Sequence, residues 1–134
     1  MKCLIVEDDS ISRRVLKEFV ISCLECDCDM AVNGEEAITS FLQAHLDKRP
    51  YNLICMDIMM PGIDGQEAVR RIRDMEKEMG VTPDEEARII MTSALDDPGS
   101  VVKAYYKGGA TSYLVKPLSK QKLAQELRAL GLLR

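Results

Sequence analysis

The sequence predicts one α/β domain, built as a doubly wound five-stranded parallel sheet with helices on both faces. The first observation is the length of 134 residues, which suits a single packed core. The second is a series of short apolar runs without polar alternation, a pattern typical of strands buried on both faces of a parallel sheet. The third is that segments with a helical apolar spacing separate these runs. Strand and helix therefore alternate along the chain.

Four of the expected strands are clear apolar runs, and a fifth is weak. The clear runs are Cys3–Val6, Leu53–Met56, Ile89–Met91 and Tyr113–Val115. Each of them ends in polar residues or in a Gly or Pro signal. The weak candidate is Cys28–Val32, which precedes the turn signal Asn33-Gly34.

The expected helices are segments in which apolar residues recur every three or four positions. Their stripes are Ile11, Val15, Phe19 and Cys23; Ala37, Ile38, Phe41, Leu42 and Leu46; Ala68, Val69, Ile72, Met75 and Met79; Val101, Val102 and Tyr105; and Leu123, Leu127 and Leu130. Ser10 is expected to cap the first helix, because a serine side chain can accept a hydrogen bond from a free N–H group there. The stretch from Gly80 to Glu86 has neither pattern and is expected to be an enlarged surface loop.

The composition disfavours nucleic acid and membrane partners. Eighteen Lys and Arg against 22 Asp and Glu give a net charge of −4, which offers no attraction to DNA, RNA or an anionic bilayer. No apolar run approaches the roughly 18 residues of a membrane span, and no signal peptide pattern follows Met1. We therefore expect no direct nucleic acid binding, no membrane insertion and a cytoplasmic location.

The cysteines are expected to be reduced thiols. Their number is five, an odd count in a chain that can build a core without disulfides. Cys23, Cys26 and Cys28 lie close in sequence, but there is one histidine, His45, and no second cysteine pair to complete a tetrahedral metal site. Cys23 and Cys28 are expected to pack against the core, with Cys26 in a loop.

Polar residues with complementary chemistry follow the predicted strands, where the ligand sites of such sheets lie. These residues are Glu7-Asp8-Asp9, Asp57, Thr92-Ser93 and Lys116-Pro117. Carboxylates brought together at one edge repel each other unless a hard cation such as Mg²⁺ lies among them. A lysine and a hydroxyl beside them suit a phosphoryl group carried on a carboxylate.

This ordered set resembles the receiver domain of two-component response regulators, and more narrowly the single-domain members similar to chemotaxis regulators. The resemblance extends from Lys2 to about Leu133. Its motifs are Val6-Glu7-Asp8-Asp9-Ser10, Met56-Asp57-Ile58-Met59-Met60-Pro61-Gly62-Ile63-Asp64-Gly65, Met91-Thr92-Ser93-Ala94 and Tyr113-Leu114-Val115-Lys116-Pro117. It implies a flavodoxin-like topology and one receiver domain over residues 1–134 with no output domain.

The resemblance also implies roles for single residues. Asp57 corresponds to the phosphoacceptor, Lys116 to the contact with the phosphoryl group, Thr92 to the hydroxyl that moves toward the phosphate, and Tyr113 to the aromatic residue that follows it. The peptide bond before Pro117 corresponds to a cis bond in the family.

The metal ligands implied by the resemblance are Glu7, Asp8, Asp57 and the backbone carbonyl of Met59, with Mg²⁺ as the cofactor. The family's acidic pair immediately follows the first strand, so Asp9 takes a variable position.

The implied function is a phosphorylation-dependent signalling switch, not an enzyme acting on other substrates. Asp57 would take a phosphoryl group from a sensor histidine kinase or a histidine phosphotransfer protein. The domain would then change its surface toward a downstream target protein, or pass the phosphoryl group onward. We expect a monomer or a weak dimer.

Two alternatives belong to other classes. A haloacid-dehalogenase-type phosphatase or phosphotransferase also forms an aspartyl phosphate, but it needs a second acid two residues after the nucleophile, where this chain has Met59. A flavodoxin needs a phosphate-binding loop after the first strand, where the acids Glu7-Asp8-Asp9 would repel a phosphate.

A long-lived phosphorylated state is also expected. In the family, side chains two residues after the acceptor and two after the threonine help to admit or orient the hydrolytic water. Here these residues are Met59 and Ala94, neither of which holds a water by a strong hydrogen bond.

Overall fold

The computed structural model describes residues 1–93 and 109–133, and these form the predicted doubly wound α/β architecture. The sheet has five parallel strands in the order β2-β1-β3-β4-β5. The strands are β1 (Lys2–Val6), β2 (Asp27–Ala31), β3 (Leu53–Asp57), β4 (Arg88–Ser93) and β5 (Ser112–Val115). The predicted fold class is therefore confirmed.

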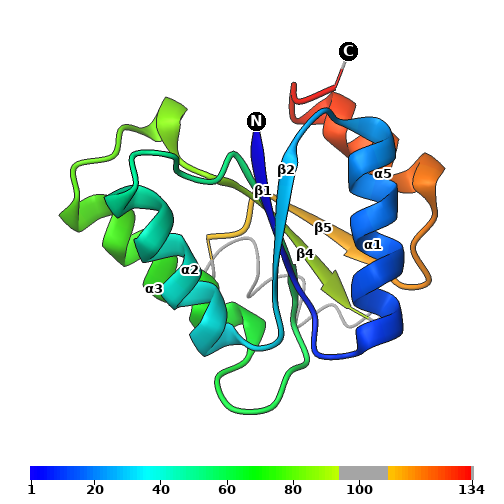
Figure 1. Cartoon of the computed structure of the whole chain (residues 1–134), viewed down its shortest axis with the longest axis horizontal. Helices are drawn as coiled ribbons and strands as arrows, with labels where there is room; N and C mark the ends of the chain where they lie inside the picture. The colour runs from blue at the N-terminus through cyan, green and yellow to red at the C-terminus, as the bar shows by residue number, and fades with distance from the viewer. Residues whose placement is uncertain (94–108, 134) are drawn as a thin grey trace.

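Helices cover both faces of the sheet, as Figure 1 shows, with α2 and α3 on one side and α1 and α5 on the other. The helices are α1 (Ser10–Cys23), α2 (Gly34–Leu46), α3 (Gly65–Glu78) and α5 (Lys120–Ala129). The irregular stretch expected from Gly80 to Glu86 contains a short 3-10 helix, η1 (Pro83–Glu85). The helix expected around Val101 and Tyr105 lies outside the described residues.

The core has two layers because the sheet is apolar on both faces. All five residues of β3 are buried, which accounts for an apolar run without alternation. One layer packs the sheet against α2 and α3, with Phe41 and Ile72 fully buried there. The other packs it against α1 and α5, with Val20 and Leu127 fully buried.

The weak apolar pattern of β2 follows from its place at the edge of the sheet. It pairs with β1 alone, and only Ala31 of its residues is fully buried. Asp27 and Asp29 are exposed on this edge, where charged side chains discourage pairing with another chain.

Each of the four described α-helices follows a side chain that accepts a hydrogen bond from the N–H group three residues ahead, as N-caps do. The pairs are Asp9 with Ser12, Asn33 with Glu36, Asp64 with Glu67, and Ser119 with Lys122. The prediction that Ser10 caps α1 is wrong, because Ser10 is the first residue inside the helix and the Asp9 carboxylate makes the capping bond at 2.8 Å. Both residue types cap well, so the sequence alone could not separate adjacent candidates.

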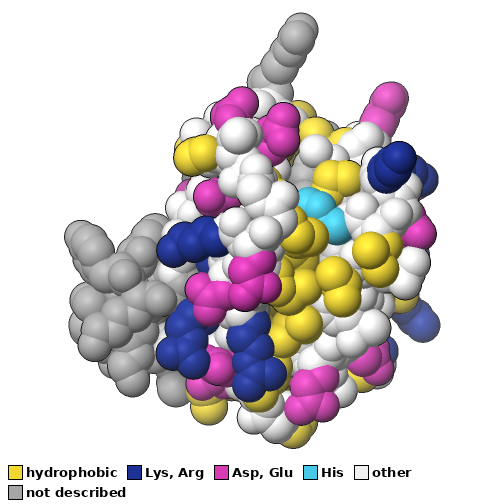
Figure 2. Space-filling view, turned by 90° about the vertical axis from the view of Figure 1, so that its left-hand side faces the viewer, with side chains coloured by type: hydrophobic (Ala, Val, Ile, Leu, Met, Phe, Trp, Pro, Cys, Tyr) yellow, Lys and Arg dark blue, Asp and Glu magenta, His cyan; other side chains and the backbone are white. Residues whose placement is uncertain are grey.

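The surface over α2 and α3 carries charges of both signs beside a strip of hydrophobic side chains (Figure 2). Leu42 and Leu46 of α2 are exposed, while His45 is partly buried with its ring edge against Phe41. Among the described residues, no helix combines the length and apolarity that a membrane crossing requires.

Candidate functional site

The predicted site residues lie at the point where the chain reverses its direction of winding across the sheet. The chain passes from β1 to β2 on one side, and β3 then pairs with β1 on the other side. Ligands of open α/β sheets bind at the carboxyl ends of the strands beside such a point. Glu7 and Asp8 directly follow β1, and Asp57 is the last residue of β3.

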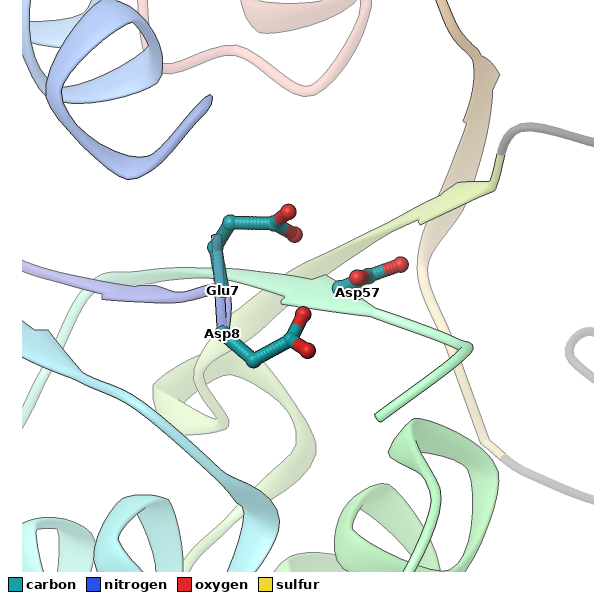
Figure 3. A group of neighbouring side chains, drawn as sticks. All are labelled: Glu7, Asp8 and Asp57. Carbon is teal, nitrogen blue, oxygen red and sulfur yellow. The ribbon is translucent and has the colours of Figure 1, made fainter. Parts of the chain in front are cut away.

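Three carboxylates converge there (Figure 3). One carboxylate oxygen from each of Glu7, Asp8 and Asp57 lies within 4.8 Å of the other two. Glu7 and Asp57 are buried, whereas Asp8 is exposed and opens the group to solvent. Asp9 is not part of this group, because its carboxylate is bonded to the backbone of α1.

Lys116, which follows β5, reaches the same group with its side chain. Its Nζ atom lies 3.2 Å from both carboxylate oxygens of Glu7 and 3.6 Å from Oδ2 of Asp57. One ammonium group thus faces three carboxylates, so the group carries an excess of negative charge. The peptide bond between Lys116 and Pro117 is cis, as the resemblance implies.

Burial and the excess of negative charge affect the pKa of Glu7. Burial raises the pKa of Glu7 to about 7, with a further upward contribution from Asp57, while Lys116 acts in the opposite direction. The folded state therefore holds a proton on Glu7 more tightly than the unfolded chain does.

We expect Glu7→Gln to flatten the pH dependence of stability in the metal-free protein. Because the folded pKa lies above the ordinary value of 4.5, ionisation of Glu7 costs stability as the pH rises from about 4.5 to about 7. The free energy of unfolding from urea titrations with a chelator present, measured across this range, checks the effect. Glu18→Gln, a change at an exposed glutamate of α1, serves as the control. If the free energy of unfolding depended on pH in the same way in Glu7→Gln and in the wild type, the raised pKa of Glu7 would be contradicted.

Thr92 and Tyr113 lie on the two strands beyond Asp57. Thr92 is buried and is the register partner of Asp57 across β3 and β4. Tyr113 pairs with Met91 on the next strand and packs, partly buried, against the core layer of α2 and α3. The two residues of the expected switch therefore lie on neighbouring strands.

The loop after Asp57 is held close to the Asp57 side chain. The backbone N–H of Met59 donates to Oδ1 of Asp57 at 3.3 Å, and the Met59 side chain is 63% exposed. Gly65, the first residue of α3, packs so closely that a Cβ atom there would lie 2.1 Å from the carbonyl oxygen of Asp57. A glycine at this position lets the loop close against the end of β3.

Sequence reasoning missed Arg13, which holds the backbone of the acidic turn. Its Nη1 atom donates to the carbonyl oxygens of Glu7 at 2.8 Å and Asp8 at 3.4 Å. The only available signal was a basic residue on the first turn of a helix, and such residues are common on helix surfaces. Arg13 is a positioning residue for the two acids.

The donor set fits a hard divalent cation. Carboxylate oxygens are the ligands that Mg²⁺ prefers, and a cation among them would relieve the repulsion by Asp57 that adds to the effect of burial on the pKa of Glu7. Among the residues that the structure describes, this is the one cluster of metal-ligating side chains found.

Comparison with known proteins gives the family. The model of the response regulator receiver domain matches residues 3–128. The chain belongs to this family. The rice two-component response regulator ORR41 is 38% identical to this receiver domain over 124 residues, which cover 92% of the chain and 88% of the relative. The transcriptional regulatory protein ResD of Bacillus subtilis is 36% identical over 132 residues, which cover 96% of the chain.

Relatives and solved structures differ in how much of their length the receiver domain spans. It covers 47% of ResD, about half of that regulator. The receiver domain of the Arabidopsis histidine kinase CKI1, solved with Mg²⁺ and BeF₃⁻, matches with a TM-score of 0.80 and 29% identity over 97% of this chain and 89% of that one. A second solved structure contains the receiver domain of Saccharomyces cerevisiae Ssk1 and the histidine phosphotransfer protein Ypd1. It matches with a TM-score of 0.80 and 28% identity, and the match covers 94% of this chain and 85% of that one.

The family match decides among the alternatives from the sequence. A receiver domain functions as a phosphorylation-dependent switch in phosphorelay signalling, and the haloacid-dehalogenase-type alternative is not supported. Membership of this family also excludes the flavodoxin alternative.

Proposed function

We propose that Asp57 is the phosphoacceptor of this receiver domain, and that Glu7, Asp8, Asp57 and the backbone carbonyl of Met59 hold Mg²⁺. The observation that carries the proposal is the convergence of three carboxylates within 4.8 Å, with the Lys116 ammonium group 3.6 Å from Asp57. A carboxylate nucleophile beside acidic metal ligands and a lysine is the arrangement that phosphoryl transfer requires.

An oxygen of Asp57 would attack phosphorus in line while the bond to the phosphohistidine nitrogen of the donor breaks. Bound Mg²⁺ would neutralise part of the charge on the phosphoryl oxygens. Lys116 supplies the other positive charge. Its Nζ atom lies near both Glu7 and Asp57, so a phosphoryl group on Asp57 would compete with Glu7 for the ammonium group. Arg13 keeps the acidic turn in place during the reaction.

Thr92 and Tyr113 would transmit the modification. A phosphoryl group adds roughly two negative charges and strong hydrogen-bond acceptors beside Thr92. A hydrogen bond from the Thr92 hydroxyl would pull that side chain toward Asp57, and Tyr113 could then pack further inward. The result is a population shift between two packings of the surface around β5.

The donor is proposed to be a sensor histidine kinase or a histidine phosphotransfer protein. An apolar groove of about 490 Å³ begins at Glu7 and Lys116 and extends between α1 and the chain after β5. Ile11, which lines it, is 73% exposed, so the groove offers apolar surface beside the reacting carboxylate. A helix presenting a phosphohistidine could rest on this groove with its imidazole at Asp57. The structure of Ypd1 with the Ssk1 receiver domain supports this class of partner.

Labelling from a small phosphodonor such as acetyl phosphate tests the proposal. We expect phosphoryl incorporation with Mg²⁺ and none with a chelator. Without the metal, three carboxylates face one ammonium group, and their excess negative charge repels the phosphodonor. Lys116→Ala should bind Mg²⁺ but be labelled more slowly, while Lys120→Ala, a change at an exposed lysine of α5, should behave as wild type. Equal labelling of wild type with and without the metal would contradict the proposal.

The phosphorylated state is expected to be long-lived because Met59 cannot orient a hydrolytic water. The Met59 backbone is hydrogen-bonded to Asp57, and its exposed, flexible side chain could cover the phosphoryl group, while Ala94 lies outside the described residues. Met59→Asn combined with Ala94→Glu should shorten the lifetime by about 10-fold, which corresponds to about 1.4 kcal/mol of barrier. The decay of acid-labile phosphate measures the effect.

Met79→Asn, a change at the exposed methionine that follows the last residue of α3, is the control for added polarity. A decay rate that is the same in the double variant and in the wild type would refute shielding by Met59.

A further inference from the structure

A buried ion pair on α3 belongs to no part of the proposed phosphoryl site. Nη1 of Arg73 lies 2.7 Å from Oε1 of Glu76, and the Glu76 side chain is almost fully buried. The other carboxylate oxygen of Glu76 accepts a hydrogen bond of 2.9 Å from the backbone N–H of Ala87, which directly precedes β4. A buried ion pair adds little net stability, because both charges lose their hydration, so its contacts indicate a role other than stability.

The rest of the Arg73 guanidinium group bonds the segment that enters β5. Its Nε atom donates to the carbonyl oxygen of Gly109 at 2.9 Å, and its Nη2 atom donates to Oγ1 of Thr111 at 3.2 Å. Three donors of one planar group thus have three acceptors, a geometry that a lysine cannot reproduce. Gly109 leaves room for this approach, because a Cβ atom there would lie 2.9 Å from Cγ of Arg73. One side chain therefore joins α3 to the start of β5.

β5 depends on such contacts because it is a short strand at the edge of the sheet. It pairs with β4 alone, and Ser112 is the one buried residue of its four. The backbone N–H of Ile89 on β4 donates to the same Oγ1 atom of Thr111 at 3.0 Å. The Ser112 hydroxyl donates to the carboxylate of Glu126 on α5, a helix on the other face of the sheet (Figure 1). Helices on both faces thus hold neighbouring residues at the start of β5.

The two elements that Arg73 joins also carry the two sides of the phosphoryl site. α3 begins at Gly65, which packs against the carbonyl oxygen of Asp57, and β5 ends directly before Lys116. Because the spacing of successive Cα atoms is fixed, a shift along the strand at the start of β5 reaches Lys116. The Lys116 ammonium group lies 3.6 Å from Asp57, and at this range a small displacement changes the alignment of reacting groups.

We propose that Arg73 is a positioning residue for phosphoryl transfer. By fixing the start of β5, it sets the position of the Lys116 ammonium group relative to Asp57. Glu76, which is bonded to the chain before β4, keeps the guanidinium group in its orientation. The inference rests on the proposed function of Asp57 and Lys116, and it extends the phosphoryl site to a residue that contacts the amino ends of β4 and β5.

Arg73→Lys tests the proposal and keeps a positive charge beside the buried carboxylate of Glu76. At saturating Mg²⁺, labelling from acetyl phosphate, followed by intact mass, should be about 10-fold slower than in the wild type. The affinity for Mg²⁺ should not change, because Arg73 contacts none of the clustered carboxylates. Arg70→Ala is the matched control, since Arg70 is an exposed arginine of the same helix, and this variant should be labelled like the wild type.

Thr111 gives the same test without a change of charge. Thr111→Val removes the hydroxyl that accepts from Arg73 and should also slow labelling. Thr111→Ser keeps a hydroxyl at this position and should be labelled at the wild-type rate. A wild-type rate in either Arg73→Lys or Thr111→Val would overturn the proposal.

The background of Lys116→Ala separates positioning from a general effect on the fold. If Arg73 acts through Lys116, Arg73→Lys should slow labelling no further once the ammonium group is gone. The same slowing in both backgrounds would show that Arg73 does not act through Lys116, and would overturn the proposal. Labelling that persists in Asp57→Asn would instead refute the proposed function, and this inference with it.

Discussion

Replacing Asp8 with alanine is expected to weaken Mg²⁺ binding by roughly 100-fold, since loss of an outer-shell partner alone can cost 10–100-fold in affinity. Asp8 supplies one of the three clustered carboxylates and is the one exposed to solvent. Without it, Glu7 and Asp57 remain near Lys116, which already balances part of their charge. Titration of Mg²⁺ by calorimetry, or through amide chemical shifts of residues at the strand ends, gives the affinity.

Asp9→Ala is the matched control, because Asp9 is also acidic and directly adjacent. Its carboxylate caps α1 through the N–H of Ser12, so the change should lower stability and leave Mg²⁺ affinity nearly unchanged. If Asp9→Ala lowered the Mg²⁺ affinity more than Asp8→Ala did, the acidic pair would have been misplaced by one residue.

Much of the site could be predicted from the sequence because strand ends are easy to locate. An apolar run that is buried on both faces ends where polar residues begin, and parallel strands bring these ends to one edge of the sheet. Glu7, Asp57 and Lys116 were identified in this way. The apolar run of β2 was weak for the opposite reason, since an edge strand with exposed residues has little to distinguish it from a loop.

Other features depend on contacts that no local pattern encodes. Lys116 and Glu7 are 109 residues apart, and their pairing requires the finished sheet. Arg13 holds the acidic turn through backbone oxygens, which carry no sequence signature. The position of Cys28 opposite Cys3 likewise follows from the register of β1 and β2, not from cysteine spacing.

Asp57→Asn is expected to abolish phosphorylation. Asparagine has nearly the same shape as aspartate but lacks the negative oxygen that attacks phosphorus. Asp64→Asn is the control, because Asp64 caps α3 and asparagine caps equally well. That variant should be labelled like the wild type.

The most direct test of Asp57 as the phosphoacceptor is the intact mass of the protein after incubation with acetyl phosphate and Mg²⁺. We predict the mass of one added phosphoryl group in the wild type and in Asp64→Asn, and no adduct in Asp57→Asn. Equal labelling of Asp57→Asn and wild type would contradict the account.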